Sequence, residues 1–167
     1  MKSSKPIKRN ENLLWLSRDH HHGLMLGWKV KQGLQNGTDL REIAAYVHFC
    51  WVHAIMPHFK DEEQYLFVAL PEKDGKRCLA EAQHAYLKQL AEIINDGSRI
   101  LCEHIFEEFS EMMERHIRFE EKILFPYLEQ KLNSEELNKI GWQLEQTHAV
   151  KFVDNWHHEF WKKRAEG

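Results

Sequence analysis

The stretch HFKDEEQYLF at residues 58–67 returns as HIRFEEKILF at residues 116–125. The histidine, both glutamates, the leucine and the phenylalanine stand at the same places in the two stretches. Upstream of them, His21 and His84 also match, because each is followed three residues later by a leucine. The chain therefore contains an internal repeat of two similar halves, each with one early histidine and one later histidine–glutamate pair.

Apolar residues in both halves recur at the spacing of three and four that is typical of helices. Glycine and proline are few, and they fall where helices would end, as at Asn36-Gly37 and in Pro71 to Gly75. No alternating strand pattern of useful length is present. These signals predict helices over residues of about 11–35, 39–69, 75–95, 98–131 and 134–163.

Two of the predicted helices begin with a capping-box pattern, Asp39 with Glu42 and Asn133 with Glu136. Pro57 lies inside the second predicted helix, where the missing backbone N–H predicts either a bend or a split. Because the connections between the first four helices are short, we expect neighbouring helices to be antiparallel. The predicted class is all-α: an up-down four-helix bundle with an additional C-terminal helix. We expect a single domain over residues 1–167, with the core bundle at about 13–132 and the extra helix at about 134–163.

Composition narrows the class of protein. The 167 residues are 43% hydrophobic and 29% charged, as in ordinary globular domains. A formal net charge of -3 gives no basic field for nucleic acid. Cys50, Cys78 and Cys102 are odd in number and widely spaced, which predicts a reducing compartment and no disulfide framework. The polar first residues and the absence of any apolar run of bilayer length predict a cytoplasmic protein without a membrane partner.

The spacing of the repeated histidines and glutamates has a chemical meaning. Residues four apart lie on one face of a helix, with Cβ atoms roughly 5–6 Å apart, so an imidazole and a carboxylate can bind one cation together. Two such pairs and two upstream histidines would bring four imidazoles and two carboxylates to the bundle axis. The predicted metal ligands are His21, His58, Glu62, His84, His116 and Glu120.

This donor set suits iron, which accepts imidazole and carboxylate together. The predicted cofactor is a di-iron centre of two Fe ions with an oxo or hydroxo bridge. Two Fe²⁺ ions carry four positive charges, and two glutamates with one hydroxide return three, which leaves little charge to bury. Without metal, burying the two glutamates would cost several kcal/mol each.

Several neighbouring residues leave alternatives open. His21 shares a helix face with Leu24 and Trp28 and is the preferred ligand of the first helix, with His20 as the alternative. Glu63 and Glu121 point about 100° away from the predicted bridging glutamates. They are either solvated or accept a hydrogen bond from a ligating imidazole.

Four further histidines give no second site. His104 and Glu108 have the ligand spacing, but they lie about 120° round the helix from His116 and should face outward. The last predicted helix carries histidines without a carboxylate partner at ligand spacing, namely His148, His157 and His158.

The ordered set of motifs resembles the hemerythrin-like family, the His-His-Glu cation-binding domains. The resemblance covers residues of about 13–132. It rests on Asp19-His20-His21, His58-xxx-Glu62, His84, and His116-xxx-Glu120 followed by Leu124-Phe125-Pro126. It implies a hemerythrin-like four-helix bundle with a non-haem di-iron centre. Members of this family store or carry dioxygen, sense oxygen or iron, or respond to nitric oxide and oxidative damage.

The sequence departs from the oxygen-carrying hemerythrins at two positions. Those proteins have a second histidine four residues after the one in the third helix, and Lys88 stands there in this chain. Their last ligand is an aspartate five residues after the fourth-helix histidine, whereas this chain has Glu120 at four and Glu121 at five. The pattern is closer to the iron-sensing and repair-type members, which argues against simple oxygen carriage.

The sequence thus predicts a non-haem di-iron protein that binds or senses dioxygen, nitric oxide or iron. The first alternative is a di-iron oxidase or peroxidase, or an iron donor for iron–sulfur repair. No further acid–base signature separates an enzyme from a binding protein. The second alternative is a structural metal-binding or interaction module, although six ligands are too many for one closed zinc site. The expected partners are small molecules such as O2 or NO, with a homodimer left open.

Overall fold

The computed structural model describes residues 8–148 and 150–163, and this part of the chain contains helices and no strand. Two elements are 3-10 helices, η1 and η4, and three are π-helical, η2, η3 and η5. In chain order the elements are η1 (Glu11–Leu13), α1 (Leu14–Gln35), α2 (Leu40–Cys50), η2 (Trp51–Ile55), α3 (Met56–Asp61), η3 (Glu62–Leu66), η4 (Phe67–Ala69), α4 (Gly75–Asn95), α5 (Glu103–Phe119), η5 (Glu120–Leu124), α6 (Phe125–Lys131) and α7 (Ser134–Thr147).

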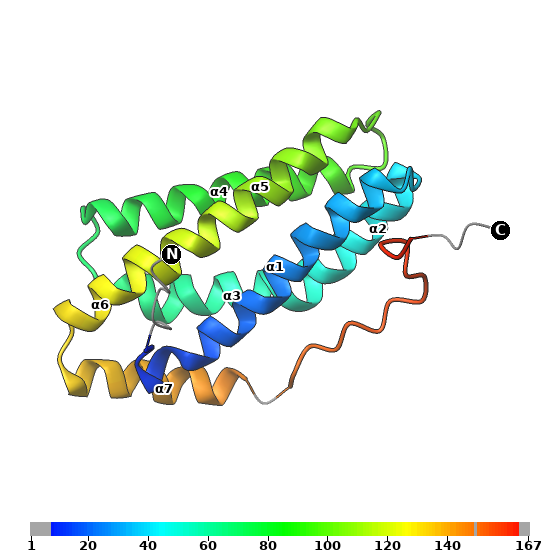
Figure 1. Ribbon diagram of the computed structural model, residues 1–167. Helices are drawn as coiled ribbons and strands as arrows, with labels where there is room; N and C mark the ends of the chain where they lie inside the picture. The colour runs from blue at the N-terminus through cyan, green and yellow to red at the C-terminus, as the bar shows by residue number, and fades with distance from the viewer. Residues whose placement is uncertain (1–7, 149, 164–167) are drawn as a thin grey trace, which may run out of the picture.

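The helices form four rods that lie side by side (Figure 1). The first rod is α1, the second runs from α2 to η4, the third is α4, and the fourth runs from α5 to α6. α1 contacts α2 and α5, and α4 contacts the same two elements, so the rods close around a common axis. α7 lies at one end of the bundle, against η1 and η3. The predicted all-α bundle with an additional C-terminal helix is confirmed.

Local sequence sets where the rods begin and end. Gly37 has φ of +65° and closes α1, with Gly37 N–H donating to Leu34 and Thr38 N–H donating to Gly33, the bonds of a Schellman motif. Asp39 caps α2 with its side chain. At α7 the full capping box predicted from the sequence is present, with bonds in both directions between the N-cap and the third helical residue.

Pro57 neither breaks the second rod nor leaves it regular. It is the second residue of α3, directly after the π-helical segment η2. Proline is tolerated in the first turn of an α-helical segment, because the N–H groups there have no partner within that segment. Pro126 holds the same place in α6 after the π-helical η5. Each rod therefore passes its proline by a local change of helix type, although the two prolines do not occupy equivalent positions of the repeat, since Pro57 precedes His58 and Pro126 follows Phe125.

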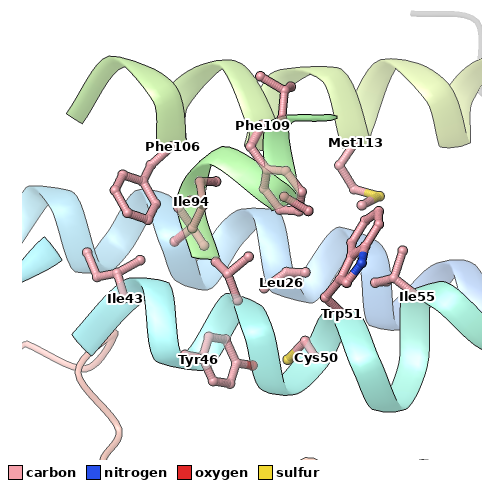
Figure 2. Packing of buried hydrophobic residues seen from close by; sticks show 14 of the residues in the cluster. Leu26, Ile43, Tyr46, Cys50, Trp51, Ile55, Ile94, Phe106, Phe109 and Met113 are labelled. Carbon is pink, nitrogen blue, oxygen red and sulfur yellow. The ribbon is translucent and has the colours of Figure 1, made fainter. Parts of the chain in front are cut away.

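Buried apolar side chains form two clusters. The first apolar cluster fills the space between α1, α2, α4 and α5, and Figure 2 shows Trp51, Phe109 and Met113 meeting inside it. The second apolar cluster lies toward the end that carries α7. It contains Leu13, Leu16, Leu66, Phe67, Leu70, Ala80, Phe119, Leu124, Phe125, Leu128, Ile140 and Leu144.

The helix predicted over residues 134–163 ends at Thr147, so the prediction is wrong for its second half. Residues 150–163 instead run back along α1 and α2 without a regular helix (Figure 1). Phe152, Trp156 and Phe160 recur at every fourth position, which mimics a helical face. This segment packs against the bundle, so Phe160 enters the first apolar cluster while Phe152 and Trp156 are partly buried against it. A Cβ on Gly33 would lie 2.7 Å from the Phe160 ring, so this contact needs glycine.

A partly buried ion pair anchors the same segment. Asp154 accepts hydrogen bonds from Lys29 Nζ at 2.5 Å and from the hydroxyl of Tyr46. Lys29 is buried and its Nζ lies 3.8 Å from the centroid of the Trp161 ring. Burial raises the pKa of Asp154, but the bonds from Lys29 and Tyr46 outweigh that effect and hold its pKa below the usual value. The segment is therefore tied to both α1 and α2 by charge as well as by aromatic packing.

No helix in the described parts of the chain combines the length and the apolar character that crossing a bilayer requires.

We predict that Phe160→Ala lowers the free energy of unfolding by about 3 kcal/mol, because it leaves a cavity in the first apolar cluster. Urea denaturation measures this loss. Val153→Ala is the matched control on the same segment, since Val153 is 69% exposed and its loss should cost less than about 0.5 kcal/mol. Equal effects of the two substitutions would show that the segment does not contribute to the core.

We predict that the stabilisation from Asp154 disappears in acid. A carboxyl whose pKa is depressed by folding stabilises the fold above its unfolded pKa of about 4, and this contribution is lost as pH falls through the folded pKa. The difference in unfolding free energy between the wild type and Asp154→Asn should be large at pH 7 and shrink below about pH 4. A difference that does not change between pH 7 and pH 3 would contradict the ion pair.

Candidate metal centre

Six polar side chains are buried along the bundle axis where the two apolar clusters meet. On α1, His20 lies between Leu16 of the second cluster and Leu26 of the first. The four histidines of the set are at most 6% exposed, and both glutamates are fully buried. The six residues are His20, His58, Glu62, His84, His116 and Glu120.

The repeat in the sequence is also a repeat in the structure. His58 and Glu62 lie one turn apart on the second rod, and His116 and Glu120 lie one turn apart on the fourth. Each glutamate is the first residue of a π-helical segment, η3 or η5. Such single π turns inside α-helices are frequent at functional sites, because the extra residue changes the direction of the side chains that follow.

The donor atoms form two groups that share both carboxylates. The first group is His20, His58, Glu62 and Glu120, and the second is Glu62, His84, His116 and Glu120. In each group the candidate ligand atoms lie within 4.8 Å of one another.

Each carboxylate reaches one histidine of each group. Glu62 lies 3.0 Å from His58 Nε2 and 3.2 Å from His84 Nε2. Glu120 lies 2.9 Å from His20 Nε2 and 3.4 Å from His116 Nε2. The two glutamates thus lie between the two groups, as bridging carboxylates would.

The four histidines present Nε2 to the centre because each Nδ1 faces an oxygen outside it. Nδ1 of His20 lies 2.6 Å from Glu121, and Nδ1 of His84 lies 2.8 Å from Glu63. Nδ1 of His116 lies 2.9 Å from the side-chain oxygen of Gln83, and Nδ1 of His58 lies 3.4 Å from Asp19. Because these oxygens accept, Nδ1 carries the proton in each neutral ring and Nε2 keeps a lone pair for a metal.

Aromatic rings hold the imidazoles from the side. Phe59 stacks on His84 with ring centroids 3.7 Å apart, and Phe125 stacks on His20 at 5.4 Å. The imidazole planes are therefore fixed by packing on their faces as well as by the hydrogen bonds at Nδ1. Such support from both directions is typical of a preorganised ligand set.

The protein alone leaves this centre unsatisfied. His58 Nε2, both oxygens of Glu62 and Oε1 of Glu120 are buried without a hydrogen-bond partner in the described structure. Nε2 of His84 and Nε2 of His116 face each other at 3.1 Å, so two lone pairs would meet there unless a proton or a cation lies between them. Buried polar atoms without partners cost free energy. Cations bound by the six side chains would remove that cost, so the residues fit a metal.

Electrostatics show how strongly these groups act on one another. Burial and the charge of Glu62 raise the pKa of Glu120, whereas His58, His20 and His84 overcome burial and hold the pKa of Glu62 well below its usual value. Burial lowers the pKa of His116, with the charges of nearby histidines in the same direction. The carboxylates and imidazoles therefore share few protons at close range. Divalent cations would replace these protons and bind the deprotonated groups.

The order of these residues along the chain agrees with one known family. Residues 79–150 match the family model of the hemerythrin HHE cation-binding domain. This match confirms the hemerythrin-like resemblance of the chain and includes His84, His116 and Glu120. The candidate ligands of the first half, His20, His58 and Glu62, lie outside the match, and the fold brings them to the same centre. Comparisons with curated proteins and with solved structures return no match.

His20, not His21, belongs to the donor groups. The sequence prediction of His21 is wrong in this respect, because His21 is exposed. The prediction used Leu24 and Trp28 to define the inner face of the helix, but these are 43% and 48% exposed. The inner face is instead marked by glycine. A Cβ on Gly23 would lie 2.7 Å from Ile117, so this glycine allows α1 to approach α5. A glycine has no side chain, so a helix face that is defined by apolar side chains does not include it.

The structure brings together the other five predicted residues: His58, Glu62, His84, His116 and Glu120. Glu63 and Glu121 are not among the two donor groups but bond to Nδ1 of His84 and His20, which was one of the two alternatives for them. Two outer acceptors, Asp19 and Gln83, were given no role from the sequence, although Asp19 belongs to the Asp19-His20-His21 motif. The sequence signal that they share is that each directly precedes a buried histidine.

The remaining histidines lie outside the centre, as predicted. The His104 side chain is 82% exposed and faces Glu107. His157 and His158 are exposed, on the C-terminal segment. His148 is different, because its Nε2 lies 2.7 Å from Asp19, the outer partner of His58.

We predict that His20→Ala and His21→Ala differ sharply in metal content. His20→Ala removes a donor from one group and should lose at least half of the bound metal, whereas His21→Ala removes only an exposed ring. Elemental analysis of the two purified variants after growth in iron-rich medium measures this difference. Loss of metal in His21→Ala alone would restore the original prediction from the sequence.

Proposed function

We propose that this chain is a non-haem di-iron protein that binds or senses dioxygen, nitric oxide or iron. The observation that carries the proposal is the pair of donor groups that share Glu62 and Glu120. The match to a hemerythrin cation-binding domain agrees with it. Together they favour a dinuclear site over a single ion.

The ligand count favours two iron ions. Each group offers two imidazole nitrogens and one oxygen from each glutamate, a mixed set that suits iron. Four protein donors leave positions open on an ion that takes six ligands. A structural zinc ion is usually closed by four ligands and would not need the shared carboxylates.

The surroundings of the site restrict what can reach it. Both glutamates are fully buried and the histidines nearly so, and apolar clusters lie on both sides. Bulk water is therefore excluded, and a diatomic molecule is the size of ligand that fits. When bound, ferrous iron would supply the electron density that dioxygen or nitric oxide needs for binding.

Two features favour sensing or reaction with oxygen over reversible carriage. The donor groups are alike, two imidazoles and two carboxylates each, so the protein does not single out one ion for the diatomic ligand. Lys88 stands where the oxygen carriers have a further histidine, and its Nζ bonds Glu63 at 2.6 Å, away from the donor groups. Within the described residues, no further acid–base group joins the donor groups, which gives the enzyme alternative no support of its own. A cytoplasmic location and a homodimer stay predictions.

We predict about two iron ions per chain after iron-rich expression, with an oxo-bridged ferric absorption in air. Glu62→Ala or Glu120→Ala should remove both ions, because each carboxylate belongs to both groups. Elemental analysis and absorption spectra measure these outcomes.

Glu108→Ala is the matched control, because Glu108 lies four residues after His104 but on the exposed side of the same helix. It should keep the iron content of the wild type. One ion retained in Glu120→Ala would sink the shared-carboxylate assignment, and zinc in place of iron would favour a structural metal module.

A further inference from the structure

A cavity of about 320 Å³ lies beside the metal centre, between α1, the η2–α3 part of the second rod and the start of the C-terminal segment. Its volume is within the range of small-molecule sites, roughly 300–1,000 Å³. His58 and Asp19 form part of its wall, and His148 and Phe152 close it from the C-terminal side. His58 is the one residue that both lines this cavity and belongs to a donor group, among the described residues.

The acidic groups of the cavity wall are already engaged. Asp19 bonds Nε2 of His148 at 2.7 Å and faces Nδ1 of His58 at 3.4 Å. Asp61 accepts a hydrogen bond from Thr147 Oγ1 at 3.0 Å. These carboxylates therefore have little attraction left for a cationic ligand.

The basic groups of the wall are not engaged in the same way. Arg18 and Lys151 form no ion pair with any carboxylate in the described residues, although both line the cavity. The guanidinium of Arg18 lies over the Trp15 ring, 5.7 Å from its centroid. Both side chains are exposed at the mouth of the cavity, so they are able to meet a ligand there. The charged groups at this mouth that are free to pair with a ligand are therefore the positive side chains of Arg18 and Lys151.

The rest of the wall includes the side chains of His22, His53 and Thr147, and its apolar part is partly flat. Trp15 and Phe152 contribute aromatic rings, and Ala54 and Pro57 contribute small apolar surfaces from the second rod. The Trp15 ring also packs on the ring of His148, with centroids 5.4 Å apart. A ligand that matches this wall has a flat apolar body and a single negative charge at one end.

We propose that this cavity binds a small organic monocarboxylate with a flat apolar body, its carboxylate held by Arg18 and Lys151. The body packs between Trp15 and Phe152. This site does not depend on the metal, because no group that holds the proposed ligand belongs to the donor groups.

Benzoate is the probe, titrated by calorimetry into the purified full chain, with the metal content of the same sample measured in parallel. We expect saturable binding of one benzoate per chain. The double variant Arg18→Gln/Lys151→Gln should weaken it about tenfold, as expected for two partly exposed ion pairs. Arg115→Gln/Lys139→Gln is the control, because it removes equal charge from exposed positions on α5 and α7 that do not line the cavity.

Three further measurements separate the alternatives. Ala54→Phe fills the cavity and should abolish binding, while its circular dichroism and melting temperature report whether it folds. Benzyl alcohol, which lacks the charge, and inorganic phosphate, which lacks the apolar body, should both bind more weakly than benzoate. A carboxylate that binds the metal directly would be insensitive to Arg18→Gln/Lys151→Gln and would need a metal-loaded sample.

No saturable binding of benzoate, equal effects of the two double variants, or phosphate binding as tightly as benzoate would each overturn the proposal. If Ala54→Phe does not fold, the exposed double variants still decide. Benzoate binding in a sample without iron would support the benzoate site even if the di-iron proposal fails. A chain that contains two iron ions but does not bind benzoate would support the di-iron proposal and contradict the benzoate site.

Discussion

Burial of two carboxylates among four imidazoles is the constraint on which the bundle depends. Apolar clusters on both sides close the axis and remove the water that would otherwise solvate Glu62 and Glu120. The free energy of that burial is recovered only if positive charge reaches the centre. The apolar core and the donor groups therefore depend on each other, because packing excludes water from the carboxylates and a bound cation would balance their charge.

Support for the donors comes from outside the centre and from both halves of the chain. An oxygen faces each Nδ1, and these oxygens belong to side chains that are partly in contact with solvent, such as Glu63 and Glu121. The same arrangement continues outward at Asp19, which joins His58 to His148, the residue directly after α7. The end of α7 is therefore in contact with the outermost layer of the centre, although it supplies none of the donor groups.

The sequence predicted most of the fold, because repeated motifs, caps and helical spacing are local signals that tertiary packing did not override. It also predicted the residues of the second, third and fourth rods that the structure brings into the two donor groups, where the inner face is marked by large apolar residues. It failed at His21, since the inner face of α1 is marked by glycines that let α5 approach. It failed again after Thr147, because aromatic residues four apart satisfy a helical pattern and an extended segment on a groove equally well. Both errors concern contacts between distant parts of the chain, which spacing along the sequence does not encode.

The sharing of the glutamates has a consequence for how many copies of the chain the centre needs. One half of the chain carries His20, His58 and Glu62, and the other carries His84, His116 and Glu120. Each donor group takes both imidazoles from one half and exchanges a carboxylate with the other. A single hairpin would thus offer three of the four donors and could complete them only by pairing face to face with an identical copy. Because both hairpins belong to one polypeptide, each donor group is complete here without a second copy of the chain.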